Sequence, residues 1–191
     1  MSIKYIGLDF ETSGSNPWDK NVPIQLGMHA WETARGYDTS FYSLIGRWSW
    51  SEFEWNEKAS TIHNIPIAEL ATAPPISVVD IQAANWIIHE IGYSNRMNVI
   101  PVGWNVGGFD RQFITRWMPN LNSLLSYRTV DLNSLVFVLA GDSEKAYKDY
   151  KRAAKDYANG KLLIDEVNRH DALVDAKAAL HEFAFLRTVP K

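Results

Sequence analysis

The sequence predicts an α/β fold in three layers, with a central mixed five-stranded sheet flanked by helices. Three strand-like segments come first along the chain, and two shorter ones follow with helical patterns between them. A leading run of strands favours an antiparallel meander, whereas later strands joined by helices favour parallel crossovers. The 191 residues are 46% hydrophobic and contain no Pro/Gly/Ser linker, so we expect 1–191 to form one domain around one core.

Five segments have the residue types of strands. The first, Ile3 to Phe10, is β-branched and aromatic, which is typical of a buried strand. The second and third segments are joined by Ala34-Arg35-Gly36, a turn sequence that predicts an antiparallel hairpin. The expected strands are 3–10, 22–31, 37–45, 99–102 and 129–130.

Helical spacing and capping residues predict the helices. Apolar residues recur at helical spacing after Pro75, and Gly92 follows the last of them, so proline at the entry and glycine at the exit bound this helix. Asp131 stands where it can cap a helix after the fifth strand. The expected helices are 55–62, 75–91, 109–117, the one that follows Asp131, 143–158 and 170–185.

Charge and cysteine content limit the partners and the location. A net charge of −3 argues against binding long duplex through a broad basic face, but it permits nucleic-acid ends if carboxylates gather around bound ions. Without cysteine there is no disulfide framework and no thiolate metal site. No apolar stretch is long enough to span a membrane and no signal peptide opens the sequence, so we expect a cytoplasmic protein without a membrane partner.

Asp9 and Glu11 form the most informative pair of residues. They are two positions apart at the end of an apolar strand, so both side chains point to the same face. Two adjacent carboxylates at a buried strand end repel and resist ionising unless a cation joins them. Such oxygen ligands suit Mg²⁺ or Mn²⁺. The alternative is a solvated strand edge with two unrelated acids.

Two further segments carry residues of the same chemistry. Asp110 opens a helix after a strand and a small-residue turn, a position that helix capping alone could explain. His170 stands five residues before Asp175, so its ring can lie in the turn before the last helix while Asp175 projects from the second turn. A lone histidine is more often a surface or hydrogen-bonded core residue. That interpretation applies to His29, His89 and His181, which have no acidic motif around them.

Together, these segments resemble the DEDDh branch of the DnaQ-like 3′→5′ exonucleases, in the ribonuclease H-like superfamily. Asp9–Gly14 matches the family's Asp-x-Glu-Thr-x-Gly, and His170–Ala176 matches His-x-Ala-x-x-Asp-Ala at every defined position. The resemblance extends over about 3–180. Further matches are Asn105, Phe109 and Asp110 to His-Asn-x-x-Phe-Asp, Ala59–Ile65 to Ala-x-x-Ile-His-Gly-Ile, and Thr129–Leu132 to Asp-Thr-Leu.

The sequence departs from the family pattern in two places. Trp104 stands where the family usually has histidine, and the turn Val106-Gly107-Gly108 adds one residue, which two glycines should absorb through unusual dihedral angles. Ser15 stands where the family commonly has a bulky apolar residue that wedges against the terminal bases. A wedge of that kind is therefore not expected at this position.

The resemblance implies a two-metal mechanism. Asp9 would bridge two divalent ions, Mg²⁺ or Mn²⁺, with Glu11 and Asp175 completing one ion's site and Asp110 acting at the other. His170 would take the proton from the attacking water as general base. These five residues are the expected catalytic set, and the four carboxylates are the expected metal ligands.

The resemblance also implies the substrate. Single-stranded DNA or RNA would be digested from its 3′ end to nucleoside 5′-monophosphates, and the sequence does not choose between the two polymers. No polymerase domain is attached, so a proofreading role would need a polymerase partner in trans, and the oligomeric state is left open. The residues expected to cradle the terminal nucleotide are Phe10, Thr12, Ile62, His63 and Phe109.

Two other functions remain as alternatives. An RNase H-type endonuclease also uses four carboxylates and two metals, although the His-x-Ala-x-x-Asp-Ala segment argues against it. A non-catalytic exonuclease-like module that binds nucleic-acid ends or a polymerase would not need all five catalytic-type residues.

Two surface features have two interpretations each. The tryptophans Trp48, Trp50 and Trp55 either stack unpaired bases or pack on the sheet, and packing is favoured. A run of cations on the charged helix either contacts phosphates or forms a solvated face. That run is Lys145, Lys148, Lys151, Arg152 and Lys155.

Overall fold

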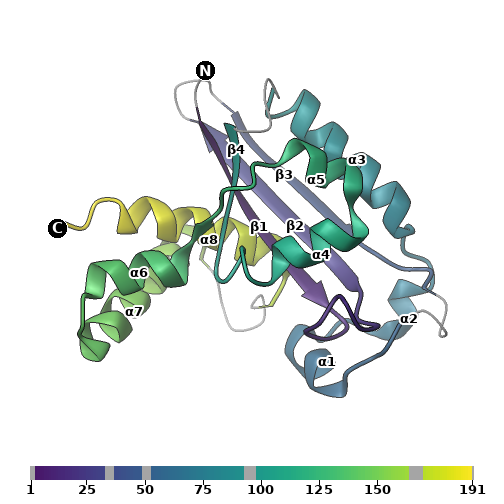
Figure 1. The fold of residues 1–191 in the computed structure, drawn as a ribbon, viewed down its shortest axis with the longest axis horizontal. Coiled ribbons are helices and arrows are strands. Elements are labelled where there is room, and N and C mark those ends of the chain that lie inside the picture. The colour runs from purple at the N-terminus through teal and green to yellow at the C-terminus, as the bar shows by residue number, and fades with distance from the viewer. Residues whose placement is uncertain (1–2, 33–36, 49–52, 93–97, 164–169, 191) are drawn as a thin grey trace.

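A five-stranded mixed sheet with helices on both sides forms the protein, as expected from the sequence (Figure 1). The computed structural model describes residues 3–32, 37–48, 53–92, 98–163 and 170–190. The strand order is β3-β2-β1-β4-β5, in which β1 pairs antiparallel with β2 and parallel with β4. The strands are β1 (Lys4–Thr12), β2 (Pro23–Glu32), β3 (Tyr37–Leu44), β4 (Val99–Gly103) and β5 (Val130–Asp131).

Eight helices are described, two more than the sequence predicted. The unexpected α2 and α5 are a single turn and six residues long, too short for an apolar period to show. Asp80 of α3 holds the start of α5 by accepting the N–H of Leu121 at 2.8 Å. The helices are α1 (Glu57–His63), α2 (Ile67–Leu70), α3 (Ile76–His89), α4 (Asp110–Trp117), α5 (Pro119–Leu124), α6 (Leu132–Ala140), α7 (Glu144–Leu162) and α8 (Ala172–Leu186).

The hairpin expected between the second and third strands is present. β2 and β3 pair antiparallel from Gln25↔Leu44 to Glu32↔Tyr37. The turn residues 34–36 lie outside the described part of the chain. Asp131 caps α6 as expected, because its side chain accepts the N–H groups of Asn133 and Ser134.

Alternation along β1 divides the two faces of the sheet. Ile6, Leu8 and Phe10 point into the larger core, which also contains Phe113 and Ile114 of α4. The intervening residues point to the other face, where α8 packs. Figure 1 shows α4 and α5 in front of the strands and α8 behind them. Asp9 and Glu11 therefore share the face of β1 that α8 covers.

Two glycines let α8 lie directly on β1 and β2. A Cβ at Gly7 would collide with the backbone carbonyl of Ala176, and a Cβ at Gly27 would collide with the backbone of Ala172. No larger residue fits at either strand position while the helix keeps this place. The close approach brings the first turn of α8 beside the acidic end of β1.

No helix among the described residues has both the length and the apolar character to cross a bilayer.

Candidate active site

Four carboxylates converge at the end of β1. Asp9 and Glu11 come from β1, Asp110 is the first residue of α4, and Asp175 lies in the first turn of α8. The sequence had placed Asp175 in the second turn, and the difference arises because Asp171 caps the helix, which therefore begins at Ala172. Since α4 and α8 pack on opposite faces of the sheet, Asp110 and Asp175 reach β1 from opposite sides.

Asp110 is fixed to β1 by a hydrogen bond. Its Oδ1 accepts the backbone N–H of Phe10 at 3.1 Å, and its side chain is almost fully buried. Phe10 lies between the two acidic residues of β1, so this bond fixes the position of the Asp110 carboxylate relative to Asp9 and Glu11. The structure thus joins the imperfect second motif to the first.

Burial and mutual repulsion disfavour ionisation of the carboxyl groups. Desolvation, followed by the charges of Asp110 and Asp175, raises the pKa of Asp9 well above its usual value. Desolvation and the charge of Asp175 raise the pKa of Glu11 to about 8. Desolvation also raises the pKa of Asp110 to about 8, although its backbone hydrogen bonds oppose the shift. Such a cluster is stabilised in its ionised form by cations.

His170 lies at the mouth of this cluster. Its backbone adopts the left-handed conformation, with φ 62°, and its side chain is exposed. One ligand atom from each of Glu11, His170 and Asp175 lies within 4.8 Å of the others, a spacing at which they could hold a divalent ion. Asp9 and Asp110 complete the donor set, and their oxygen ligands fit hard cations such as Mg²⁺ or Mn²⁺.

The start of α8 is anchored by Gln25, a residue that the sequence did not single out. Gln25 is buried on β2 directly opposite Glu11. Its Oε1 accepts the N–H of Ala172 at 2.8 Å, and its Nε2 donates to Asp171 Oδ2 at 3.3 Å. A glutamine among the apolar residues that begin this strand, 23–28, was the available sequence signal. Its carboxamide ties the helix that carries Asp175 to the strand next to Glu11.

All five residues expected to cradle a nucleotide line one cavity of about 340 Å³. Glu11 also lines it, so the cavity opens onto the carboxylate cluster. His63 is buried there, and its Nδ1 accepts the N–H of Ile65 at 3.0 Å, which places the ring proton on Nε2. That Nε2 has no hydrogen-bond partner among the described residues. It is a buried donor available to a ligand. The five residues are Phe10, Thr12, Ile62, His63 and Phe109.

A second cavity, of about 330 Å³, lies on the α8 side of the carboxylates and is lined by Asp9, His170 and Asp175. Trp104, at the histidine position of the family motif, forms one wall and donates its indole N–H to the buried Glu182. This bond gives the tryptophan a structural partner on α8.

The cations of α7 divide into two groups. Lys145, Lys148 and Arg152 pair with carboxylates of the same helix, as a solvated face does. Lys151 and Lys155 instead line the second cavity, with their Nζ atoms 4.8 and 5.8 Å from the Trp104 ring centre. Of the five cations on α7, Lys151 and Lys155 are the ones that line a cavity of the candidate site.

The extra residue in the second motif is absorbed at Asn105. This residue takes the left-handed conformation with φ 58°, whereas Gly107 and Gly108 do not have positive φ. The expectation that the glycines supply unusual dihedral angles was therefore wrong. A side chain at either position would make a neighbouring side chain shift: a Cβ on Gly107 would lie 2.9 Å from Thr129 Oγ1, and one on Gly108 would lie 2.6 Å from Asn105 Oδ1.

The tryptophans after β3 pack internally, as favoured from the sequence. Trp48 contacts Trp117 edge to face with ring centres 5.3 Å apart. Trp55 packs against Phe53 and His63. Trp50 lies outside the described residues.

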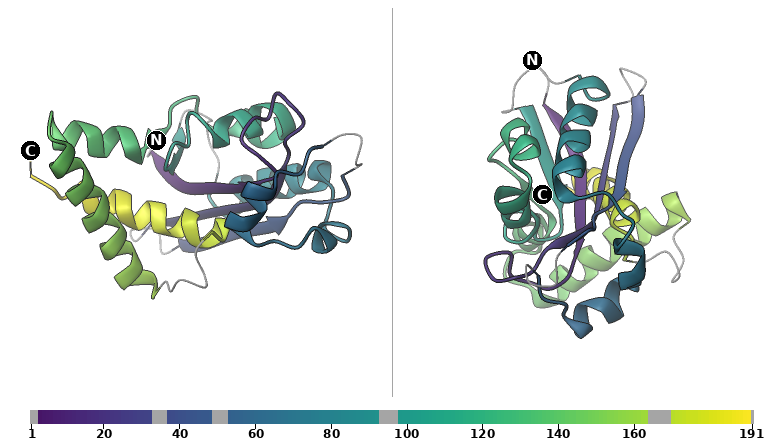
Figure 2. Two further views of the ribbon diagram at one scale, coloured as in Figure 1. Left: turned by 90° about the horizontal axis from the view of Figure 1, so that it is seen from below. Right: turned by 90° about the vertical axis from the view of Figure 1, so that its right-hand side faces the viewer.

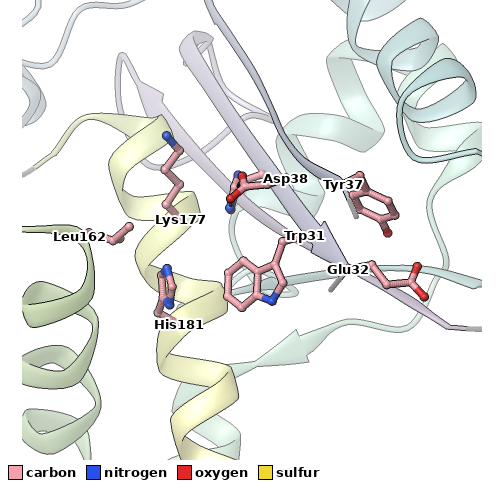
Figure 3. Close-up of a pocket in the computed structure, with 8 residues that line it drawn as sticks. Trp31, Glu32, Tyr37, Asp38, Leu162, Lys177 and His181 are labelled. Atoms are coloured by element: carbon pink, nitrogen blue, oxygen red, sulfur yellow. Dashed lines mark ion pairs between the residues drawn. The ribbon is translucent and has the colours of Figure 1, made fainter. Parts of the chain in front are cut away.

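A larger cavity of about 500 Å³ lies away from the carboxylates, between α8 and the β2–β3 hairpin (Figure 3). Lys177 and His181 of α8 face Trp31 and Asp38 across it. None of the residues expected in the site lines it. The chemistry favours the two smaller cavities, because the clustered carboxylates and His170 open onto them.

Comparison with known proteins supports the fold. No family model matches the chain. An oligoribonuclease of Paracidovorax citrulli (strain AAC00-1) is 28% identical over 111 residues, which are 58% of this chain and 50% of that protein. The chain thus spans about half the length of this curated relative.

Solved structures of nucleases share the architecture at low sequence identity. Cell-death related nuclease 4 superimposes with a TM-score of 0.62 at 16% identity, over 97% of this chain and 63% of that one. The nuclease domain of 3′hExo, a DEDDh family member bound to rAMP, gives 0.60 at 14% identity, over 97% and 91%. Escherichia coli exonuclease I, bound to single-stranded DNA and zinc, gives 0.60 at 19% identity, over 98% and 41%. The expected α/β fold, a mixed five-stranded sheet flanked by helices, is confirmed and is shared with these nuclease structures.

Proposed function

We propose that this protein is a metal-dependent 3′→5′ exonuclease that acts on single-stranded nucleic acid and releases nucleoside 5′-monophosphates. The observation that carries the proposal is the convergence of Asp9, Glu11, Asp110 and Asp175 with His170 beside a cavity of nucleotide size. The resemblance to an oligoribonuclease and to exonuclease structures supports the same reaction class.

The four carboxylates would hold two divalent cations. Two divalent cations, when bound, would activate water and neutralise charge at the scissile phosphate. Asp9, Glu11 and Asp175 would hold the cation on the α8 side, and Asp110 the cation on the α4 side, with Asp9 shared. The cations would favour the ionised form of Asp9, Glu11 and Asp110, whose pKa values are raised by burial.

His170 would transfer the proton. It is exposed at the mouth of the cluster and lies next to the capping residue Asp171, so a solvent path exists from its ring to bulk water. We assign it the role of general base toward the attacking water. Its ring also lies close enough to Glu11 and Asp175 to act as a metal ligand.

The cavity that contains His63 would hold the 3′-terminal nucleotide. The unpartnered Nε2–H of His63 can donate to an oxygen of the sugar or phosphate, and Phe109 and Ile62 supply apolar contacts. The 5′-phosphate of the bound nucleotide would then lie at Glu11, where the cavity meets the carboxylates.

The test is digestion of 3′-labelled and 5′-labelled single-stranded oligonucleotides, as matched DNA and RNA, with Mg²⁺ or Mn²⁺. We expect mononucleotides to appear from the 3′ end, and Asp9→Ala and Asp175→Ala to abolish the activity. Full activity of either variant would refute the site. Cleavage of a circular substrate would instead support an endonuclease, and absence of turnover at micromolar protein would support a non-catalytic binding module.

A further inference from the structure

Trp18 presents an exposed aromatic ring that the structure holds in place. The residue lies in the loop between β1 and β2, and its side chain is 57% exposed. Three hydrogen bonds fix it: its N–H donates to Asn16 Oδ1 at 3.0 Å, its Nε1 donates to Gln112 Oε1 at 3.1 Å, and its carbonyl accepts from Arg116 at 3.2 Å. An exposed indole held by these hydrogen bonds is already ordered before a partner binds.

Arg116 adds a cation to this surface. Its guanidinium carbon lies 5.8 Å from the Trp18 ring centre and 4.8 Å from that of Trp117. No carboxylate among the described residues forms an ion pair with it. An aromatic ring beside an arginine is the combination that binds single-stranded nucleic acid, because the ring stacks on a base and the cation meets a phosphate.

The position of this surface relative to the carboxylates suggests which nucleotide it meets. Gly14 and Ser15 of the same loop line the cavity proposed for the terminal nucleotide. Gln112, which holds the indole, is two residues beyond Asp110 on α4. Figures 1 and 2 show the loop after β1 beside α4, on the side of the sheet away from α8.

In-line displacement gives the direction of the strand. The attacking water and the leaving 3′ oxygen lie on opposite sides of the phosphorus. His170 and Asp175 approach from the α8 side, so the leaving oxygen and the rest of the strand would lie on the α4 side. The strand would then continue from Asp110 along α4 toward Gln112 and Arg116.

We propose that Trp18 and Arg116 form a stacking platform for the nucleotide immediately 5′ of the scissile phosphate. This inference rests on the proposed exonuclease function and adds the contact that selects an unpaired strand. A base stacks on Trp18 only if it has left a duplex. The platform thus supplies an apolar contact near the position where the family's wedge residue is replaced by Ser15.

Two substrates distinguish a loss of base stacking from a loss of phosphodiester hydrolysis. The p-nitrophenyl ester of thymidine 5′-monophosphate carries the nucleoside and the phosphate but has no upstream base, whereas a single-stranded ten-nucleotide DNA or RNA has one. We expect Trp18→Ala to lower kcat/KM for the oligonucleotide about 5- to 100-fold, as lost base stacking predicts, and to leave hydrolysis of the ester within about twofold. Trp18→Phe should recover most of the loss, and Arg116→Gln should weaken only the oligonucleotide reaction.

Phe137→Ala is the matched control, because Phe137 is also an exposed aromatic, at 65%, on α6 and outside both smaller cavities. It should leave both reactions unchanged, and thermal unfolding should confirm that each variant is folded. An unchanged oligonucleotide reaction in Trp18→Ala would overturn the platform, as would equal losses on both substrates. Wild-type protein that hydrolyses neither substrate would overturn the proposed function itself.

Discussion

Gln25 accepts the backbone N–H of Ala172 through its side-chain oxygen at 2.8 Å, and so joins β2 to the first residue of α8. The same carboxamide donates to Asp171, the residue that follows His170 in the chain. The place of the candidate general base therefore depends on a residue that would touch neither metal nor substrate. Gln25 is a positioning residue.

Replacing Gln25 by leucine should impair the reaction more than binding. The variant keeps the side chain's approximate size but leaves the N–H of Ala172 without its acceptor, so the start of α8 should loosen. We expect kcat to fall about 10- to 100-fold, the usual loss when a residue that orients metal ligands is replaced, and KM to change little. Steady-state kinetics on a single-stranded oligonucleotide measures both.

Tyr42→Phe is the control for that experiment. The Tyr42 hydroxyl accepts from Gln25 Nε2 at 3.0 Å. Removing this hydroxyl leaves the bonds from Gln25 to Asp171 and Ala172 in place, so kcat should stay within about twofold. A Gln25→Leu enzyme with unchanged kcat would show that the helix start is held by its other contacts.

His170→Ala distinguishes a general base from a ligand. As a general base, His170 contributes about 10²–10⁴ in rate, so the variant should lose that much activity while its affinity for Mn²⁺ hardly changes. Calorimetric titration with Mn²⁺ and single-turnover kinetics give the two quantities. A large loss of Mn²⁺ affinity would instead make His170 a metal ligand, as its spacing from Glu11 and Asp175 permits.

Asp110→Asn should stabilise the metal-free protein at alkaline pH. Burial raises the pKa of Asp110 to about 8, so between its unfolded value and about 8 the native state binds more protons than the unfolded state. Stability from this group is therefore present at acidic pH and is lost as pH rises toward 8. Asparagine does not ionise, so the variant should not lose this stability as pH rises.

The measurement for Asp110 is thermal unfolding in EDTA at pH 5 and pH 8. We expect the melting temperature of the variant to exceed that of wild type by more at pH 8 than at pH 5, by about 2–4 °C for each kcal/mol of relieved repulsion and desolvation. Adding Mn²⁺ at pH 8 should stabilise wild type more than the variant. An equal gain at both pH values would mean that charge is not the cause.

Gly27→Ala should destabilise the protein. A Cβ at this position overlaps the backbone of Ala172, so α8 must shift from the sheet, at a cost of about 1–3 kcal/mol. Gly160→Ala is the matched control: it lies within α7 with open space around its Cα, and alanine should stabilise that helix by about 0.5–1 kcal/mol. Urea unfolding of both variants tests the pair, and a neutral Gly27→Ala would show that α8 can move freely.

The sequence by itself determined the class of fold and the identity of the acids. Alternation of apolar residues along β1 requires Asp9 and Glu11 to share one face, since the strand period is two. Capping by Asp131 and Asp171 depends on hydrogen bonds to N–H groups two and three residues away. Local sequence is therefore enough to place the first residues of α6 and α8 within a residue or two.

Only the tertiary structure decided how the acids meet. The bond from Phe10 N–H to Asp110 joins residues 100 positions apart, and the bond from Ala172 to Gln25 joins residues 147 apart. No local period reports such contacts, because they arise when α4 and α8 close on opposite faces of one strand. The raised pKa values follow from the same closure, since burial and convergence exist only in the folded chain.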